Sequence, residues 1–465
     1  MIRLFSHYMS WRLALLIILD ALILIFALNA GTAFHLLRGG ADVGAAALSP
    51  PIALAAVLGM LVIMNSIGLY RVDDLNSLQA VLPRLIAAAA MFVLSVVCLG
   101  LYVTPPRNWA LDDLSIALLV AMTGSGVVRF AFYRWNRLST FKTRVLVLGT
   151  GSRVMKLMEY ATRNDHHVVV GCIALTSSTN HYVPLPRVLP MAPGESLLSI
   201  AAKYEVDQIV IAVRDRRGGT LPVQELLKCR LRGINVIELS TFFEREYRQV
   251  LLESLNASWM MLGEGFRQGG LRVVAKRLFD LAASTALLIL TFPIMVIAAA
   301  CIFLESGRPL LYRQERVGQG GRIFTIFKLR SMKNDAEKDG KPRWAAANDD
   351  RTTRIGRIIR KLRIDELPQI INVLKGEMSF VGPRPERPFF VDTLTAQIPY
   401  YALRHSVKPG ITGWAQVRYP YGASVDDAIE KLQYDLYYVK NHTLFLDLVI
   451  LFATVEIVIW GKGAQ

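Results

Sequence analysis

The sequence predicts a membrane protein of mixed α and α/β class: a four-helix transmembrane N-terminal region, a cytoplasmic α/β module, and an α-rich C-terminal domain with a membrane helix of its own. Hydrophobic residues make up 53% of the 465-residue chain, more than a soluble domain carries, and they concentrate in a few long runs. Between these regions lie short β-branched runs separated by helix-like segments. The length is enough for two or three domains.

Four apolar stretches open the chain, and each is close to the ~20 residues that a helix needs to cross the hydrocarbon core. The last is the weakest of the four, which are Leu13–Leu36, Pro51–Leu69, Leu85–Val103 and Leu114–Val128. The first is not a cleavable signal peptide, because it is too long, carries Asp20 and leads into three further spans. We therefore assign residues 1–140 to four transmembrane helices.

Basic residues flank these spans unevenly. They lie before the first span, between the second and third, and after the fourth, at Arg3, Arg12, Arg71, Arg84 and from Arg129 to Arg144. The alternate loops carry only Arg38 and Arg107. Because Lys and Arg are retained on the cytoplasmic side, the chain beyond Arg129 is predicted to lie in the cytoplasm.

The formal net charge of +16 requires an anionic partner or location. In a protein with apolar segments, anionic lipid headgroups explain this charge more simply than nucleic acid does. No helix-turn-helix pattern or aromatic-interleaved basic stripe is visible in the sequence, so no nucleic acid partner is expected. The four cysteines show no C-x-x-C spacing, and neither a disulfide framework nor a zinc site is indicated.

Residues 141–250 predict a Rossmann-like α/β domain, with β-branched runs at Val145–Leu148, Val168–Ile173 and Gln208–Val213. The segment Gly149-Thr-Gly-Ser-Arg-Val154 is similar to a dinucleotide-binding fingerprint. However, valine replaces the third glycine and no acidic residue ends the second strand. A phosphate-free regulatory or assembly module is therefore preferred over a nucleotide site. A glycine-rich linker at residues 251–271 follows.

A further membrane segment, at about residues 280–304, is broken near its middle at Thr291-Phe-Pro293. It is either a fifth crossing or a helical hairpin that returns to the same side. Basic clusters lie on both flanks, from Arg267 to Arg277 and from Arg308 to Arg316, so a crossing would place one cluster on the outer face. Pro293 removes a backbone donor and supplies a bend. These observations favour the hairpin, although kinked spanning helices are common.

Three C-terminal segments combine clustered cations with one adjacent pair of carboxylates: Phe327–Met332, Arg363–Gln369 and Val381–Glu386. Arginines make bidentate contacts to phosphate oxygens and neutralise charge during phosphoryl transfer. Asp365 or Glu366 can hold a magnesium ion on a diphosphate or attack phosphorus directly. Pro368 fits the first turn of a helix that runs to Lys375 and ends at Gly376, with the two acids beside its positive N-terminus.

Each of these features also has a simpler interpretation. An Asp-Glu pair before a helix is usually a favourable N-terminal charge, and arginines usually form solvated faces. Gly-Pro-Arg-Pro is consistent with a rigid turn and nothing more.

Two amphipathic segments are predicted to lie at the membrane interface. The first is a helix with arginine at every third position from Arg351 to Arg363 and isoleucines between them, which suits contact with anionic lipid. The second is Leu444–Trp460, whose Asp447 and Glu456 favour an interfacial helix over a crossing.

Five ordered motifs closely resemble those of the bacterial sugar transferase family. They are Lys276-Arg-Leu-Phe-Asp280, Lys328-Leu-Arg-Ser-Met332, Asp365-Glu-Leu-Pro-Gln369, Gly382-Pro-Arg-Pro385 and Lys408-Pro-Gly-Ile-Thr-Gly-Trp414. The resemblance covers Arg272–Gly461. The front half is similar to that of the large members, the polyprenyl-phosphate hexose-1-phosphate transferases of exopolysaccharide assembly. Thr241-Phe-Phe-Glu-Arg245 and Ser254–Trp259 resemble the exosortase-associated branch.

The resemblance implies a monotopic, α-rich catalytic domain over residues 272–465 with a re-entrant membrane helix broken at Pro293. Many relatives bend this helix at Ser-Pro, where this chain has Phe292-Pro293. The family also implies a ping-pong reaction. Asp365 attacks the β-phosphorus of a UDP-sugar, UMP leaves, and undecaprenyl phosphate then takes the phosphosugar from the enzyme.

The same resemblance implies roles for the neighbouring residues. Glu366 assists as metal ligand or base, so Asp365 and Glu366 are both candidate ligands for an Mg²⁺ cofactor. Contacts to substrate phosphates are implied for four basic residues of the matched motifs, Lys328, Arg330, Arg363 and Arg384.

These expectations describe a multi-pass protein of the bacterial inner (plasma) membrane with a cytoplasmic catalytic domain. Its partners are a UDP-sugar, undecaprenyl phosphate and membrane lipids. Two other functions stay open: a polytopic transferase with its site among transmembrane helices, for which intramembrane acids are scarce, and a non-enzymatic scaffold or regulator of polysaccharide assembly. The sequence identifies neither the sugar nor whether the protein forms a homo-oligomer.

Overall fold

The computed structural model describes residues 2–4, 7–37, 50–70, 78–102, 111–137, 142–163, 167–175, 188–190, 195–213, 221–255, 269–333, 351–420, 422 and 424–460. Most of the predicted linker at 251–271 lies outside these residues. The chain divides into two compact units. The first comprises Met1–Tyr133 and Glu264–Gln465, and the second comprises Arg134–Gly263.

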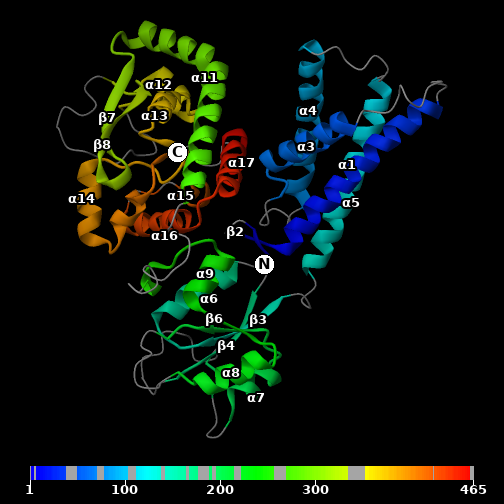
Figure 1. Cartoon of the computed structure of the whole chain (residues 1–465), viewed down its shortest axis with the longest axis vertical. Coiled ribbons are helices and arrows are strands. Elements are labelled where there is room, and N and C mark those ends of the chain that lie inside the picture. Colours follow the sequence, from blue (N-terminus) through cyan, green and yellow to red (C-terminus); the bar gives the residue numbers. More distant parts are fainter. Residues whose placement is uncertain are drawn as a thin grey trace. The chain divides into compact units, whose positions relative to one another are not determined.

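The first unit begins with a short hairpin and four mostly apolar helices (Figure 1). β1 (Ile2–Leu4) pairs antiparallel with β2 (His7–Met9). The helices are α1 (Trp11–Leu37), α3 (Pro50–Ser66), α4 (Leu78–Tyr102) and α5 (Leu111–Arg137). Each of the four apolar stretches of the sequence therefore lies in a helix.

Among the described residues, three helices are long and apolar enough to cross a membrane. Two of them belong to this N-terminal group, at Trp11–Phe34 of α1 and Ser115–Trp135 of α5, and the third is Gly270–Ser306. The apolar parts of α3 and α4, at Pro50–Ser66 and Val81–Ser95, are shorter. Leu114–Val128, the weakest stretch by sequence, thus lies in one of the longer helices. That all four stretches cross a membrane stays a prediction.

A buried ion pair explains the acidic residue in the first apolar helix. The Nη1 and Nη2 atoms of Arg129 in α5 each donate to the Asp20 carboxylate of α1 at 3.0 Å, and the Ser125 hydroxyl donates to the same carboxylate. Asp20 is fully buried and Arg129 is nearly so. Loss of either partner would leave an uncompensated buried charge. The pair therefore fixes α1 against α5.

The second unit is a four-stranded parallel sheet with helices on both faces (Figure 1). The strand order is β4-β3-β5-β6, with strands β3 (Thr143–Leu148), β4 (His167–Ile173), β5 (Gln208–Ile211) and β6 (Asn235–Glu238). The helices are α6 (Ser152–Arg163), α7 (Leu197–Lys203), α8 (Val223–Leu231) and α9 (Leu239–Glu246). The predicted α/β pattern is therefore present, with β6 as a strand that the sequence pattern did not reveal.

Side chains of β3 alternate between two apolar cores, as its period of two requires. Val145 and Val147 pack with residues of α6 and α9, including Leu157 and Phe242. Leu146 and Leu148 pack with residues of α7 and α8 on the opposite face. The sheet is thus buried on both faces, which is why its strands read as continuous apolar runs.

The C-terminal part of the first unit starts with α11 (Gly270–Ser306), a helix of 37 residues that contains Pro293. Figure 1 shows the two halves of this helix running in different directions. Proline removes a backbone donor from a helix and bends it. The Thr291 hydroxyl donates to the Leu287 carbonyl at 2.7 Å, within the turn that precedes the proline. The structure thus keeps the chain helical through the expected break.

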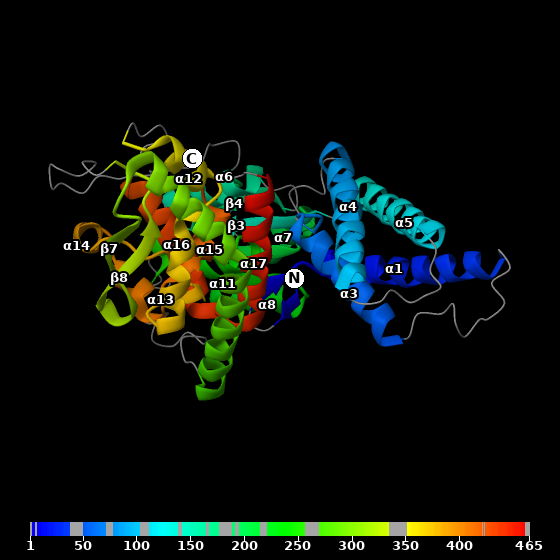
Figure 2. The same cartoon turned by 90° about the horizontal axis from the view of Figure 1, so that it is seen from above.

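The remaining elements form an α-rich domain with two small sheets. β7 (Leu311–Val317) pairs antiparallel with β8 (Ile323–Leu329), and β9 (Ser379–Val381) pairs parallel with β10 (Gly410–Thr412). The helices are α12 (Arg354–Lys361), η6 (Ile364–Gln369), α13 (Ile370–Lys375), α14 (Pro388–Gln397), η7 (Tyr401–Ser406), α15 (Trp414–Arg418), α16 (Val425–Asn441) and α17 (Leu444–Trp460). Figure 2 shows, as Figure 1 does, that α11 and α17 run side by side.

The basic amphipathic helix is shorter than the sequence predicts. The arginine repeat predicts one helix from Arg351 to Arg363, but α12 covers only Arg354–Lys361. Thr353 caps its N-terminus, and Glu305 at the end of α11 also accepts two of its first backbone N–H groups, at 2.8 and 3.1 Å. Arg363 adopts a left-handed conformation with φ of 57°, which ends the helix before the acidic pair.

Polar residues at the start of α11 hold the domain together. Lys276 donates to Asp447 of α17 at 2.7 Å, and Arg277 donates to the last carbonyls of α13 at 2.6 and 2.7 Å. Asp280 accepts from the Ser379 hydroxyl and the Phe380 N–H of the β9 segment at 3.0 and 3.1 Å. The motif that begins with Lys276 therefore ties α11 to β9, α13 and α17.

Candidate active site

The acidic pair lies in a short helical turn between two fixed points. Arg363, in its left-handed conformation, precedes the 3₁₀ helix η6, whose first turn contains Asp365 and Glu366. α13 continues directly from η6 and ends at Gly376, which has φ of 86°. The predicted helix end at Gly376 is therefore confirmed. Pro368 lies inside η6, so the acids are part of this turn instead of preceding it.

A buried asparagine aligns this turn with the β8 strand. Asn372 of α13 donates to the Thr325 carbonyl at 2.7 Å and accepts from the Phe327 N–H at 3.3 Å. These bonds hold two positions of β8 next to α13. The next residue of the strand, Lys328, consequently reaches the acidic pair.

Glu366 is held by three cations from three different segments. Its carboxylate accepts from Lys328 at 2.7 Å and from Arg384 at 2.9 Å, and it lies 3.6 Å from Arg363. Burial alone works to raise the pKa of Glu366, but Arg384, Lys328 and Arg363 together hold that pKa well below its usual range. Glu366 is therefore a permanently ionised centre for the three cations.

Asp365 is in a different electrostatic position. Its side chain is buried, and burial, followed by the charge of Glu366, raises the pKa of Asp365 to about 6. The charges of Lys328, Arg360 and Arg384 oppose this shift. Within the part of the chain that the structure describes, no hydrogen bond or ion pair engages the Asp365 carboxylate. It is thus a desolvated carboxylate with available oxygens, which is the state that suits a nucleophile.

The structure brings together four of the predicted site residues besides Asp365, namely Glu366, Lys328, Arg363 and Arg384. Arg330 is placed differently. It is buried, and its Nη2 atom donates to the Ser306 hydroxyl at 2.6 Å and the Gly307 carbonyl at 2.8 Å, at the end of α11. A phosphate contact for Arg330 stays a prediction. Pro293 lies within α11.

The residues present fit a magnesium ion only in part. Among the described residues, no group of three or more His, Cys, Asp or Glu side chains is placed to hold a metal. Magnesium in phosphoryl-transfer sites needs only one or two carboxylates together with substrate phosphates. Asp365 meets this requirement, whereas the oxygens of Glu366 already accept from cations. The donor set therefore favours Asp365 over Glu366 as a ligand.

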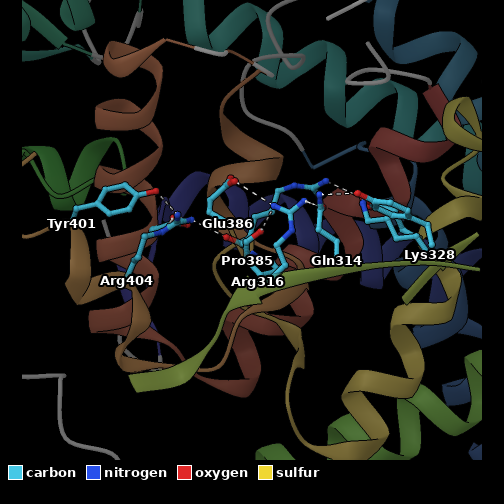
Figure 3. Close-up of polar contacts among 11 residues, drawn as sticks. Gln314, Arg316, Lys328, Pro385, Glu386, Tyr401 and Arg404 are labelled. Carbon is cyan, nitrogen blue, oxygen red and sulfur yellow. Dashed lines mark hydrogen bonds and ion pairs between the residues drawn. The ribbon is translucent and has the colours of Figure 1, made fainter. Parts of the chain in front are cut away.

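Several residues of the site were not identified from the sequence. Arg316 and Arg404 contact the backbone of the Arg384 segment, and Asp435 pairs with Arg404. Figure 3 shows these contacts as a row of polar side chains that leads from Tyr401 to Lys328. Single arginines that bind carbonyl groups follow no spacing rule. The only sequence signal was the general density of basic residues in this domain.

Fold and site together define a membrane-associated protein whose cationic centre suits phosphorylated substrates. Comparison with known sequences identifies the family to which this protein belongs. The bacterial sugar transferase family matches residues 271–461, and the chain belongs to this family. The match includes all of the site described above.

Three curated relatives illustrate the similarity. UDP-N-acetylgalactosamine-undecaprenyl-phosphate N-acetylgalactosaminephosphotransferase of Aeromonas hydrophila is 42% identical over 265 residues, 57% of this chain and 61% of the relative. UDP-glucose:undecaprenyl-phosphate glucose-1-phosphate transferase of Xanthomonas campestris is 34% identical over 69% of this chain and 67% of the relative. The uncharacterized sugar transferase EpsL of Bacillus subtilis is 42% identical over 42% of this chain and 91% of the relative.

These relatives differ in the sugar that their names specify, N-acetylgalactosamine in one and glucose in another. The chain also spans less than two thirds of the Aeromonas relative. Similarity therefore shows the family of this chain, and leaves the sugar undetermined.

Proposed function

We propose that the protein is a phosphoglycosyl transferase. It moves a sugar-1-phosphate from a UDP-sugar to undecaprenyl phosphate, giving undecaprenyl-diphosphate-sugar and UMP, and thereby starts the assembly of an exopolysaccharide or another glycoconjugate. The observation that carries the proposal is the contrast between two adjacent acids. Glu366 is held by three cations, while the buried Asp365 keeps its oxygens available.

The proposed first step uses Asp365 as nucleophile. An Asp365 oxygen attacks the β-phosphorus of the UDP-sugar, forming an acyl phosphate while the bond between the β-phosphorus and the bridging oxygen breaks. UMP leaves with that oxygen. In the second step a phosphate oxygen of undecaprenyl phosphate attacks the same phosphorus, and the Asp365 carboxylate is released. The two steps together conserve one phosphosugar group and require no other reactant.

Glu366 positions three cations for this reaction. It holds Lys328, Arg363 and Arg384 close together, where they would otherwise repel one another. Their donors then contact phosphate oxygens, which gather negative charge in the transition state. An Mg²⁺ ion held by Asp365 and the substrate phosphates would supply further charge neutralisation.

The membrane arrangement is proposed from charge and from the helices. We place four crossings in α1, α3, α4 and α5, a Rossmann-like regulatory or assembly module in the cytoplasm, and the catalytic domain on the same side. In this arrangement α11 is re-entrant over about residues 280–304 and bends at Pro293. The support is the pair of basic clusters on either side of the apolar part of α11 and the change in the direction of the helix (Figure 1). The site then faces soluble donors while remaining beside the lipid acceptor.

Asp365→Asn tests the covalent mechanism. We expect it to abolish UMP release, because an amide oxygen does not replace the attacking carboxylate. The assay uses the purified full chain in nanodiscs with undecaprenyl phosphate and a panel of UDP-sugars, which also identifies the sugar. Without undecaprenyl phosphate, the wild type should retain label from a sugar-labelled donor and the variant should not.

Asp392→Asn is the matched control, because Asp392 is an exposed acid of α14 and its removal should leave the rate unchanged. Wild-type turnover by Asp365→Asn would contradict the covalent mechanism. If Asp365 were dispensable and no donor released UMP, a scaffold or regulator of polysaccharide assembly would be the better description.

A further inference from the structure

The turn that carries Arg384 is fixed through four consecutive carbonyl groups. The Pro383 carbonyl accepts from the Gly410 N–H at 3.0 Å, and the Glu386 carbonyl accepts from the Val317 N–H at 2.9 Å. Between them, the Arg384 carbonyl accepts from Arg404 at 3.0 Å and the Pro385 carbonyl accepts from Arg316 at 3.1 Å. The four donors come from β10, β7 and η7, so three elements hold one short turn.

Two of these four donors are arginine side chains, although a surface turn normally uses water for the same purpose. The two prolines have fixed φ angles and no N–H groups, so the turn cannot form a regular hydrogen-bond ladder of its own. Its carbonyls must be held by other segments. The conformation of Arg384, which lies between the prolines, therefore depends on Arg404 and Arg316.

Arg404 is itself held in place by two further partners. Its Nε and Nη2 atoms donate to Asp435 of α16 at 3.1 and 2.7 Å, and its Nη1 atom donates to the Tyr401 hydroxyl at 2.7 Å. Figure 3 shows Tyr401 and Arg404 on one side of the Pro385 turn and Arg316 on the other. Arg404 and Asp435 are both buried. All three guanidinium nitrogens are thus used, and one of them is shared with the Arg384 carbonyl.

A buried ion pair of this kind is weak evidence for a role in stability, because desolvation of the two charges offsets their attraction. What the pair adds is geometry. The planar fork of arginine fixes the direction of each donor. Arg404 donates to the backbone carbonyl of Arg384, and the side chain of the same Arg384 contacts Glu366 at 2.9 Å.

We propose that Arg404, oriented by Asp435 and Tyr401, is a positioning residue for the transfer reaction. It fixes the backbone of Arg384 so that the Arg384 guanidinium stays beside Glu366 and Asp365. Arg316 supports the same turn through Pro385. This inference rests on the proposed function and deepens it, because it assigns a role to residues outside the cationic centre.

A double-mutant cycle tests whether Arg404 acts through Arg384. Arg404→Lys keeps the charge but loses the fork, and we expect kcat/KM for UMP release to fall about 10- to 100-fold, mainly in kcat, because small displacements of a catalytic group have effects of that size. In an Arg384→Ala background, Arg404→Lys should change the rate by no more than about twofold. Losses that multiply in the double variant, or full activity of Arg404→Lys, would overturn the proposal.

Arg322→Lys is the matched control, because Arg322 is an exposed arginine that follows the 3₁₀ turn between β7 and β8. It should leave the rate unchanged in both backgrounds. If Arg404→Lys does not fold, as judged by its thermal unfolding midpoint, Tyr401→Phe replaces it. That variant removes one acceptor and should show a smaller loss of kcat with the same dependence on Arg384.

Hydrogen exchange separates this inference from the proposed function. In the wild type, the amides of Gly410 and Val317, which donate to the Pro383 and Glu386 carbonyls of this turn, should exchange slowly, and Arg404→Lys should accelerate them while Arg322→Lys does not. Unchanged exchange would overturn the positioning role whatever the activity. Conversely, a wild-type protein that releases no UMP from any UDP-sugar would remove the proposed reaction, and faster exchange in Arg404→Lys would still establish the backbone contact.

Discussion

Asp365 and Glu366 are neighbours in the chain, yet the pKa values of their carboxyl groups shift in opposite directions. Burial works to raise the pKa of both carboxyl groups. Among the described residues, however, only Glu366 has cations within 4 Å. The charge of Glu366 then raises the pKa of Asp365 further. Environments that separate the pKa values of two adjacent acids also separate their roles. One acid organises the site, and the other is available for chemistry.

The pH dependence of UMP release should report Asp365. The proposed nucleophile is the ionised form, and its pKa is raised to about 6, so kcat/KM should rise with pH through that value and reach a plateau above it. Glu366→Gln removes the charge that raises the pKa of Asp365, and it should move this limb to lower pH as well as slow the reaction. Steady-state rates between about pH 4.5 and 8.5 provide the measurement. A limb that is absent, or that moves upward in Glu366→Gln, would contradict this assignment.

At this scale the sequence predicts the charged residues of the proposed centre and misses those that contact its backbone. Lys328, Arg384 and the acidic pair lie in dense motifs whose chemistry suits phosphates, and the structure brings them together. Arg404 was not predicted, because a side chain that binds a carbonyl group can face any backbone and needs no partner motif. The engagement of Arg330 with Ser306 likewise depends on where α11 ends.

Among the structural elements, the close parallel pairing of β9 and β10 explains two glycine-containing motifs. Gly382 follows β9, Gly410 starts β10 and Gly413 follows it. The backbones approach so closely that a Cβ atom on any of the three would overlap backbone atoms of the facing segment. Parallel pairing of these short strands places the turn with Arg384 beside the Lys408 motif. The glycines are therefore required by the close approach of the two paired strands.

Gly382→Ala should disrupt the pairing of β9 with β10. Because its Cβ would overlap the Lys408 carbonyl and the Gly410 N–H, we expect the free energy of unfolding to fall by about 1–3 kcal/mol and the activity to fall with it. The control is Gly269→Ala, since Gly269 has an ordinary φ of −70° and open space around the added methyl group. Chemical denaturation of both variants in detergent gives the comparison. Equal stability of the two variants would contradict the steric argument.

The predictions at the level of elements succeeded where periodicity is strong. The four apolar helices, three of the four strands of the α/β unit (β3, β4 and β5) and the end of α13 at Gly376 follow from the sequence pattern. The basic helix was predicted too long, because the arginine repeat continues through Arg363 while the backbone turns left-handed there. A repeat of side chains does not reveal where capping by Thr353 and Glu305 begins a helix.

Taken as a whole molecule, the protein combines apolar helices in its first part, a separate α/β unit and a basic catalytic domain. The net charge of +16 and the basic flanks of α11 both favour the cytoplasmic face of a membrane. The proposed orientation places the donor site and the lipid carrier on the same side. A crossing by α11 would separate them.

Cysteine labelling in intact cells tests this orientation. In a background without native cysteines, Arg322→Cys in the catalytic domain should resist an impermeant thiol reagent until the cells are opened. Arg107→Cys lies outside the described residues, in a loop that the charge pattern places outside the cell, and it should react at once. Immediate labelling at position 322 would show that α11 crosses the membrane.

The contacts made by the first turns of α11 have a practical meaning for handling this enzyme. Lys276, Arg277 and Asp280 belong to the same continuous helix as the apolar segment that follows them, and they hold α17, α13 and β9. Deleting α11 to obtain a water-soluble fragment would therefore remove part of the framework that shapes the reaction centre. For the same reason the choice of detergent or lipid is expected to affect the measured rate, because Asp280 of this helix contacts the β9 segment that leads into the Arg384 turn.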